Sequence, residues 1–236
     1  MQRPDAHSPP RLTPIAATYS VIVLALLLLF YLAIIMLTGM RGFVGGESSW
    51  SKSQKQAAAC LQRYATTGAE TEFACYSHHT ALTHAARRAR EELQKPKADR
   101  DTVLTYLIRA DAHPEDAPAM MTLMRRLGGQ SLVRAVNETW KQGDAEIDSM
   151  HVLALQVREQ IARGVTHDDP RMNALMREIR ATDHRLTALE LQFSQQLGEG
   201  ARYVGRMLLL LMVGAAAVLL GIALFFSSRW IRARLP

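Results

Sequence analysis

Residues 15–37, IAATYSVIVLALLLLFYLAIIML, decide the fold class of this 236-residue chain. They contain no Asp, Glu, Lys or Arg, and they exceed the roughly 20 apolar residues that cross the hydrocarbon core of a bilayer. A second uncharged stretch lies between Arg206 and Arg229. A buried soluble helix explains both stretches less well, because they are too long and too apolar. A cleaved signal peptide is also a weaker explanation for the first, whose apolar run exceeds the usual length of about 7–15 residues.

The formal net charge of +6 gathers beside these two stretches. Residues 38–203 carry 22 basic and 21 acidic side chains and are nearly neutral, so we predict no nucleic-acid partner. Short positive segments favour the cytoplasm, whereas a long loop crosses largely regardless of its charge. We therefore expect a bacterial inner-membrane protein with both termini in the cytoplasm and residues 38–203 in the periplasm.

The region between the stretches has the composition of helices, being rich in Ala, Leu, Gln, Arg and Glu. Glycine and proline divide it, and Asp116 and Pro170 are typical helix starts. Thr67-Gly68-Ala69-Glu70 has the spacing of a capping box. We expect helices at 47–66, 69–94, 99–111, 117–127, 131–163 and 170–228, the first continuing from the first span and the last running unbroken into the second.

The predicted fold class is all-α, with two transmembrane helices flanking an extracytoplasmic antiparallel helical bundle. The expected segments are a cytoplasmic tail at 1–14, transmembrane helix 1 at 15–37, a periplasmic helical sensor domain at 38–203, transmembrane helix 2 at 204–228 and a cytoplasmic stub at 229–236.

The last helix carries a heptad seam, with alternating spacings of three and four residues from Met172 to Tyr203. Such a seam either packs inside its own bundle or pairs in part with a second subunit, and we expect a homodimer. In both cases the helix would join the outer domain mechanically to the membrane. The seam residues expected to carry a signal are Ile179, Leu186, Leu189 and Phe193.

Cys60 and Cys75 lie at nearly equal distances from Gly68, where two helices are expected to fold back on each other. Both cysteines lie on apolar stripes, and a compartment outside the cytoplasm permits a disulfide. Two buried thiols remain an alternative, as does a redox switch.

Clustered basic and histidine side chains offer weaker site candidates. Arg87, Arg88, Arg90, Arg125 and Arg126 are candidate contacts for an anionic ligand, although ordinary surface pairs with nearby acids explain them more simply. The three histidines at 78, 79 and 84 lack the spacing of a helical metal pair, so we predict no metal.

The sequence contains no recognisable catalytic motif. Gly45-Gly46-Glu47 superficially resembles the start of the GGDEF signature of diguanylate cyclases, but the match ends after three residues. A phosphate-binding loop, a GxSxG elbow and a convincing Cys–His pair are all missing. We predict that the chain is not an enzyme and holds no cofactor.

Several short stretches together resemble one class of bacterial sensor. They look like the N-terminal helical extracytoplasmic region of membrane-bound GGDEF and EAL proteins, which make or degrade cyclic di-GMP. The layout is also similar to four-helix-bundle input domains of chemoreceptors and sensor kinases. The stretches are GESSWSKSQK at 46–55, LQRY at 61–64, Thr67-Gly68, RAREEL at 88–93, HPEDAP at 113–118, Trp140 and LELQFS at 189–194.

The resemblance implies an input domain whose output module follows the second span. In this sequence residues 229–236 are the last, so none of the family's catalytic residues has a counterpart. We expect a transmembrane sensory input module that detects an envelope signal and passes a helix shift to a cytoplasmic output in the same or a neighbouring chain. The alternative is a non-signalling membrane adaptor or structural protein that binds an envelope partner, and a membrane enzyme is a weaker third. The expected partners are the lipid bilayer, a second copy and the signalling output.

Overall fold

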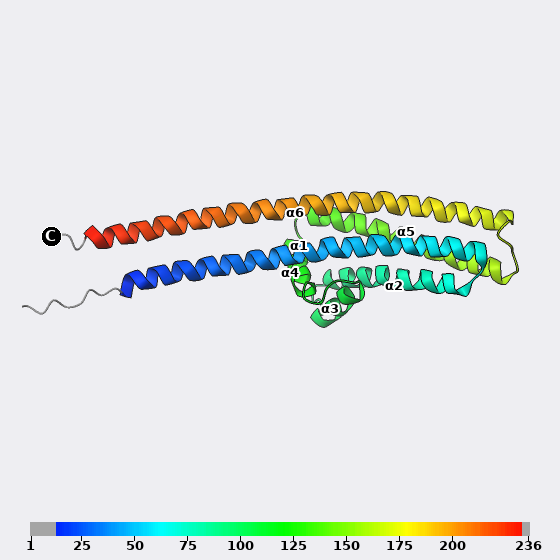
Figure 1. Ribbon diagram of the computed structural model, residues 1–236, viewed down its shortest axis with the longest axis horizontal. Coiled ribbons are helices and arrows are strands. Elements are labelled where there is room, and N and C mark those ends of the chain that lie inside the picture. The colour runs from blue at the N-terminus through cyan, green and yellow to red at the C-terminus, as the bar shows by residue number, and fades with distance from the viewer. Residues whose placement is uncertain (1–12, 233–236) are drawn as a thin grey trace, which may run out of the picture. The chain divides into compact units, whose positions relative to one another are not determined.

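The computed structural model describes residues 13–232, and within this range the chain forms helices and no strand (Figure 1). The predicted all-α class is therefore confirmed for these residues. Of the predicted tail at 1–14 and stub at 229–236, only residues 13–14 and 229–232 lie within the described range. The helices are α1 (Thr13–Thr67), α2 (Glu70–Leu93), α3 (Arg100–Arg109), α4 (Ala117–Leu127), α5 (Ser131–Ala162) and α6 (Pro170–Arg232).

Two of these helices are unusually long. α1 has 55 residues and α6 has 63, and each contains an apolar stretch long enough to cross a membrane. As expected, α1 continues from the first apolar stretch and α6 runs unbroken into the second. Length and composition thus support a membrane protein.

The chain divides into two compact units. Among the described residues, 13–35 and 204–232 belong to the first, which we call the apolar unit, and 36–203 form the second, which we call the large unit. In the apolar unit the hydroxyl groups of Tyr19 and Ser227 lie 3.1 Å apart and link α1 to α6. Most of its large aliphatic side chains are exposed, Leu210 by 73%.

In the large unit, parts of α1 and α6 pack with α2 and α5 around one apolar core, and the four run side by side in Figure 1. Polar contacts link neighbouring helices around this core. Arg63 binds Glu72 between α1 and α2, and Arg185 binds Glu146 between α6 and α5, both at 2.9 Å. The largest fully buried core side chains include Leu61, Tyr64, Tyr76, Val157, Met172, Ile179 and Leu186.

A second, smaller core joins α3 and α4 to α1 and α2. Two glycines of α1 allow α4 to approach closely. A Cβ atom at Gly39 would lie 2.8 Å from the carbonyl oxygen of Ala119, and one at Gly42 would lie 2.6 Å from the sulfur of Met120. A larger residue at Gly39 would therefore push α4 away, whereas one at Gly42 would require the Met120 side chain to move.

At two predicted helix starts the side chains do not make the expected capping contacts. No capping box forms at 67–70, because Ala69 is the N-cap and makes no side-chain cap. Asp116 does occupy the N-cap of α4, but its carboxylate accepts from Arg41 instead of from the helix backbone. In contrast, α6 begins at Pro170 as predicted.

Candidate functional site

The two cysteines form a disulfide between α1 and α2. Gly68 lies between them with φ of +66°, a left-handed conformation that glycine adopts without strain. This turn folds α2 back onto α1, so that Cys60 is fully buried beside its partner. Of the three states considered for Cys60 and Cys75, the structure contains the bonded one.

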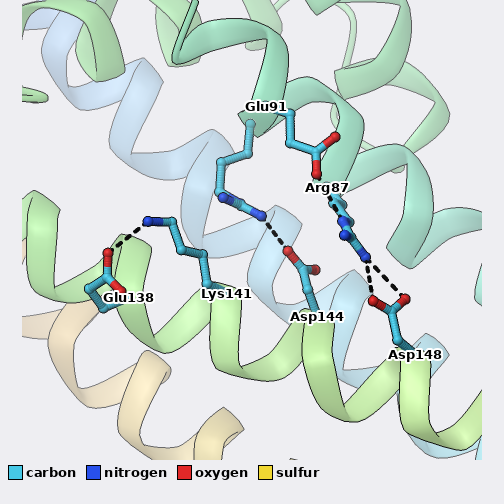
Figure 2. A network of polar contacts seen from close by, with 7 residues as sticks. Arg87, Glu91, Glu138, Lys141, Asp144 and Asp148 are labelled. Carbon is cyan, nitrogen blue, oxygen red and sulfur yellow. Dashed lines mark hydrogen bonds and ion pairs between the residues drawn. The ribbon is translucent and has the colours of Figure 1, made fainter.

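The arginines considered as anion contacts do not form one basic site. Arg87 is engaged on both sides, by Glu91 at 2.9 Å and by Asp148 of α5 at 2.8 Å (Figure 2). Arg88 is exposed on α2, and both Arg125 and Arg126 are exposed in the last turn of α4. For Arg87, therefore, the structure shows an ordinary pair between helices.

Beside this pair, Arg90 and Asp144 make a buried one. Their side chains are 4% and 6% exposed, and the guanidinium donates to the carboxylate. Burial raises the pKa of Asp144 to about 6, outweighing the lowering effect of Arg90. The guanidinium carbon also lies 5.7 Å from the ring centroid of Trp140. Figure 2 shows Asp144 on the same face of α5 as Asp148.

Next to Trp140 lies an aromatic cavity of about 50 Å³ in the large unit. We refer to it below as the aromatic cavity. Its walls come from all six described helices and the turn after α3. The lining side chains that matter for binding are Phe43, Glu47, Trp50, Trp140, Leu189 and Phe193.

Glu47 is the one ionisable side chain among the described residues that line the aromatic cavity. Burial raises the pKa of this carboxyl, the nearby Glu190 raises it further, and a hydrogen bond from Ser194 opposes both. Glu190 itself lies 3.2 Å from the ammonium of Lys55 and accepts from Ser51. Glu47 thus presents the cavity with a carboxylate that has no cation of its own in these contacts.

Trp50 supplies an unused hydrogen-bond donor. The residue is 9% exposed, and its Nε1 is buried without a hydrogen-bond partner. Gly143 of α5 lies against this side chain, since a Cβ atom at this position would be in van der Waals contact with the indole ring at 3.4 Å. Across the cavity wall, Trp140 and Phe193 meet edge to face with centroids 5.7 Å apart.

The predicted seam residues divide between two environments. Ile179 and Leu186 are buried in the core of the large unit, whereas Leu189 and Phe193 line the aromatic cavity. The sequence pattern did not indicate Glu47, Trp50 or Trp140 as binding residues. The available signal was the scarcity of tryptophan, of which the chain has three.

No family model matches the chain, and neither a curated protein nor a solved structure shows significant similarity to it. The function proposed below therefore rests on the sequence and structure of this chain alone.

Proposed function

We propose that this chain is a transmembrane sensory input module. A ligand in the aromatic cavity would bias two packings of the large unit, and α1 and α6 would carry the difference into their apolar segments. A cytoplasmic output, in the same or a neighbouring chain, would read the change. A homodimer would give that output a spacing between helix ends to detect.

This proposal rests on one observation, which is that both long helices contribute residues to the walls of the aromatic cavity. Glu47 and Trp50 come from α1, and Leu189 and Phe193 come from α6. These are the two helices that contain the apolar stretches long enough to cross a membrane. A ligand between them would therefore contact both elements able to transmit a signal, as a bistable-element mechanism requires.

The proposed topology places both termini in the cytoplasm and residues 38–203 in the periplasm of a bacterial cell. The charges that flank the apolar stretches support it. The Cys60–Cys75 disulfide supports it independently, because disulfides persist in oxidising compartments. An alkaline phosphatase reporter should be active when fused after Gly129 and inactive when fused after Pro236. The reverse pattern would reject this topology.

The signalling proposal is tested by a substitution that changes the packing around the cavity in the absence of a ligand. Gly143→Leu should displace the Trp50 ring and change the basal output of a signalling reporter fused after Pro236. Gly129→Leu is the matched control, because a Cβ atom at Gly129 meets nothing within 4 Å. Adding Gly198→Pro and Gly200→Pro, which break α6, should abolish the effect of Gly143→Leu. An output that ignores Gly143→Leu would reject the sensory function and favour an adaptor.

A further inference from the structure

We propose that the aromatic cavity binds a small organic ammonium ion, with its cationic head beside Glu47. This inference rests on the proposed function, since it names the ligand class of the same site.

The charge of the ligand follows from Glu47. It is the one ionisable group among the described lining residues, and a second carboxylate, Glu190, lies close enough to act on it. Lys55 and Ser51 engage Glu190 and leave Glu47 facing an otherwise apolar space. A cation there offsets both the burial of the carboxylate and its repulsion by Glu190, whereas an anion adds to the repulsion.

The aromatic walls favour an organic cation over a hydrated metal ion. Phe43, Trp50, Trp140 and Phe193 supply four rings, and ring faces attract alkylammonium groups. One carboxylate among such rings is far from the six or more oxygen ligands that calcium takes.

The volume of the cavity limits the size of the ligand. The cavity of about 50 Å³ accommodates about four water-sized groups, which is the scale of a methylated ammonium head. Any longer substituent of the ligand would have to extend out of the cavity. The indole N–H of Trp50 is buried without a partner and has almost no accessible surface, so Trp50 contributes its ring and not its donor.

Choline and its neutral isostere 3,3-dimethyl-1-butanol are the probes that isolate the charge. Calorimetric titration of the full chain in uncharged maltoside micelles should show choline binding at least tenfold more tightly than the isostere. Equal binding of the two probes, or heat from neither, would overturn the proposal.

Three variants assign the effect to named atoms. Glu47→Gln should weaken choline binding at least tenfold and remove the preference over the isostere. Phe193→Leu, which removes one ring of the cavity wall, should weaken choline binding about fivefold through the lost attraction between ring and cation, and should affect the isostere less. Glu178→Gln, which removes an exposed carboxylate elsewhere on α6, should bind like the parent. Circular dichroism melting of each variant verifies that it is folded, and a folded Glu47→Gln variant with unchanged choline affinity would refute the assignment.

These results separate the ligand class from the sensory function. If choline fails to bind while the fused reporter still responds to Gly143→Leu, the ammonium inference is wrong and the input module stands. If choline binds but the reporter ignores Gly143→Leu, the binding site stands without the signalling role.

Discussion

The large apolar side chains of helices α1 and α6 are mostly exposed in one unit of the molecule and mostly buried or half-buried in the other. In the apolar unit their large side chains are exposed, as with Val21 at 65% and Leu210 at 73%. In the large unit, Leu61 and Ile179 on the same two helices are fully buried. Exposed apolar surface costs about 25 cal/mol per Å² in water, so the apolar unit requires a different solvent. One pair of helices is therefore built for water in one part and for lipid in the other.

The largest difference between the units should appear when leucines of α6 are truncated. Leu186→Ala, at a fully buried site, should lower the free energy of unfolding by about 2–5 kcal/mol through lost packing and a residual cavity. Leu210→Ala, at a site 73% exposed, should change it by less than about 1 kcal/mol. Denaturant unfolding in micelles, followed by tryptophan fluorescence, measures both. Equal losses would contradict the contrast between the units.

A charge at two exposed positions, one in each unit, sharpens the comparison of their solvents. Leu210→Lys in the apolar unit should raise the apparent free energy of membrane insertion by about 3 kcal/mol. Leu191 in the large unit is 60% exposed, so Leu191→Lys should change the free energy of unfolding by no more than about 0.5 kcal/mol. The fraction of chain inserted into membranes reports the first change, and thermal unfolding reports the second. Full insertion of Leu210→Lys would argue against lipid around this position.

The disulfide should make the next largest contribution to the stability of the large unit. Its two cysteines are 15 residues apart, and a loop of that length stabilises the folded state by about 3 kcal/mol in the chain-entropy account. Cys60→Ser with Cys75→Ser should therefore lower the denaturation midpoint, and reduction of the parent chain should have a comparable effect. The apolar unit should be unaffected, so membrane insertion of the double variant serves as the control. A midpoint unchanged by both treatments would show that the bond adds no stability.

The buried ion pair makes the large unit sensitive to acid in an unusual direction. The folded pKa of Asp144 is about 6, raised from 3.8, so the folded state holds this proton more tightly than the unfolded chain. The contribution is present at low pH and is lost as the pH rises through about 6. Relative to Asp144→Asn, the parent should lose about 2 kcal/mol between pH 4 and pH 6. A constant difference between the two proteins, measured by denaturant unfolding across this range, would refute the raised pKa.

The smallest effect should come from the neighbouring exposed pair. Arg87→Gln breaks its contacts with Glu91 and Asp148, both well exposed, and should cost less than about 1 kcal/mol. Added salt should reduce even this cost, because it screens exposed charges. Thermal unfolding at low and high salt measures the effect. A loss of stability as large as that of Leu186→Ala would mean that the exposed pair is essential to the fold.

The helices were predictable because their ends depend on local chemistry. Gly164, with φ of +78°, follows α5, and Pro170 opens α6, so both boundaries could be predicted from neighbouring residues. The role of Asp116 could not be predicted in this way. Its partner Arg41 is 75 residues away, and this long-range ion pair replaces the local cap.

The aromatic cavity could not be predicted for the same reason. Trp50, Trp140 and Phe193 come from three helices, and only the packing of the large unit brings them to one place. The seam of α6 was visible as a heptad pattern, but the pattern does not distinguish Leu186, buried in the core, from Leu189, which lines the cavity. Periodicity identifies a buried face without saying what that face contacts.

The coupling between the aromatic cavity and the apolar segments is tested most directly by a distance measurement in lipid nanodiscs. Nitroxide labels on Val21→Cys and Leu224→Cys, both exposed positions, report the separation of α1 and α6, and the native cysteines are protected by their disulfide. Pulsed electron resonance should show that Gly143→Leu shifts the distance distribution between the labels, whereas Gly129→Leu leaves it unchanged. Identical distributions for the parent chain and both variants would contradict the account.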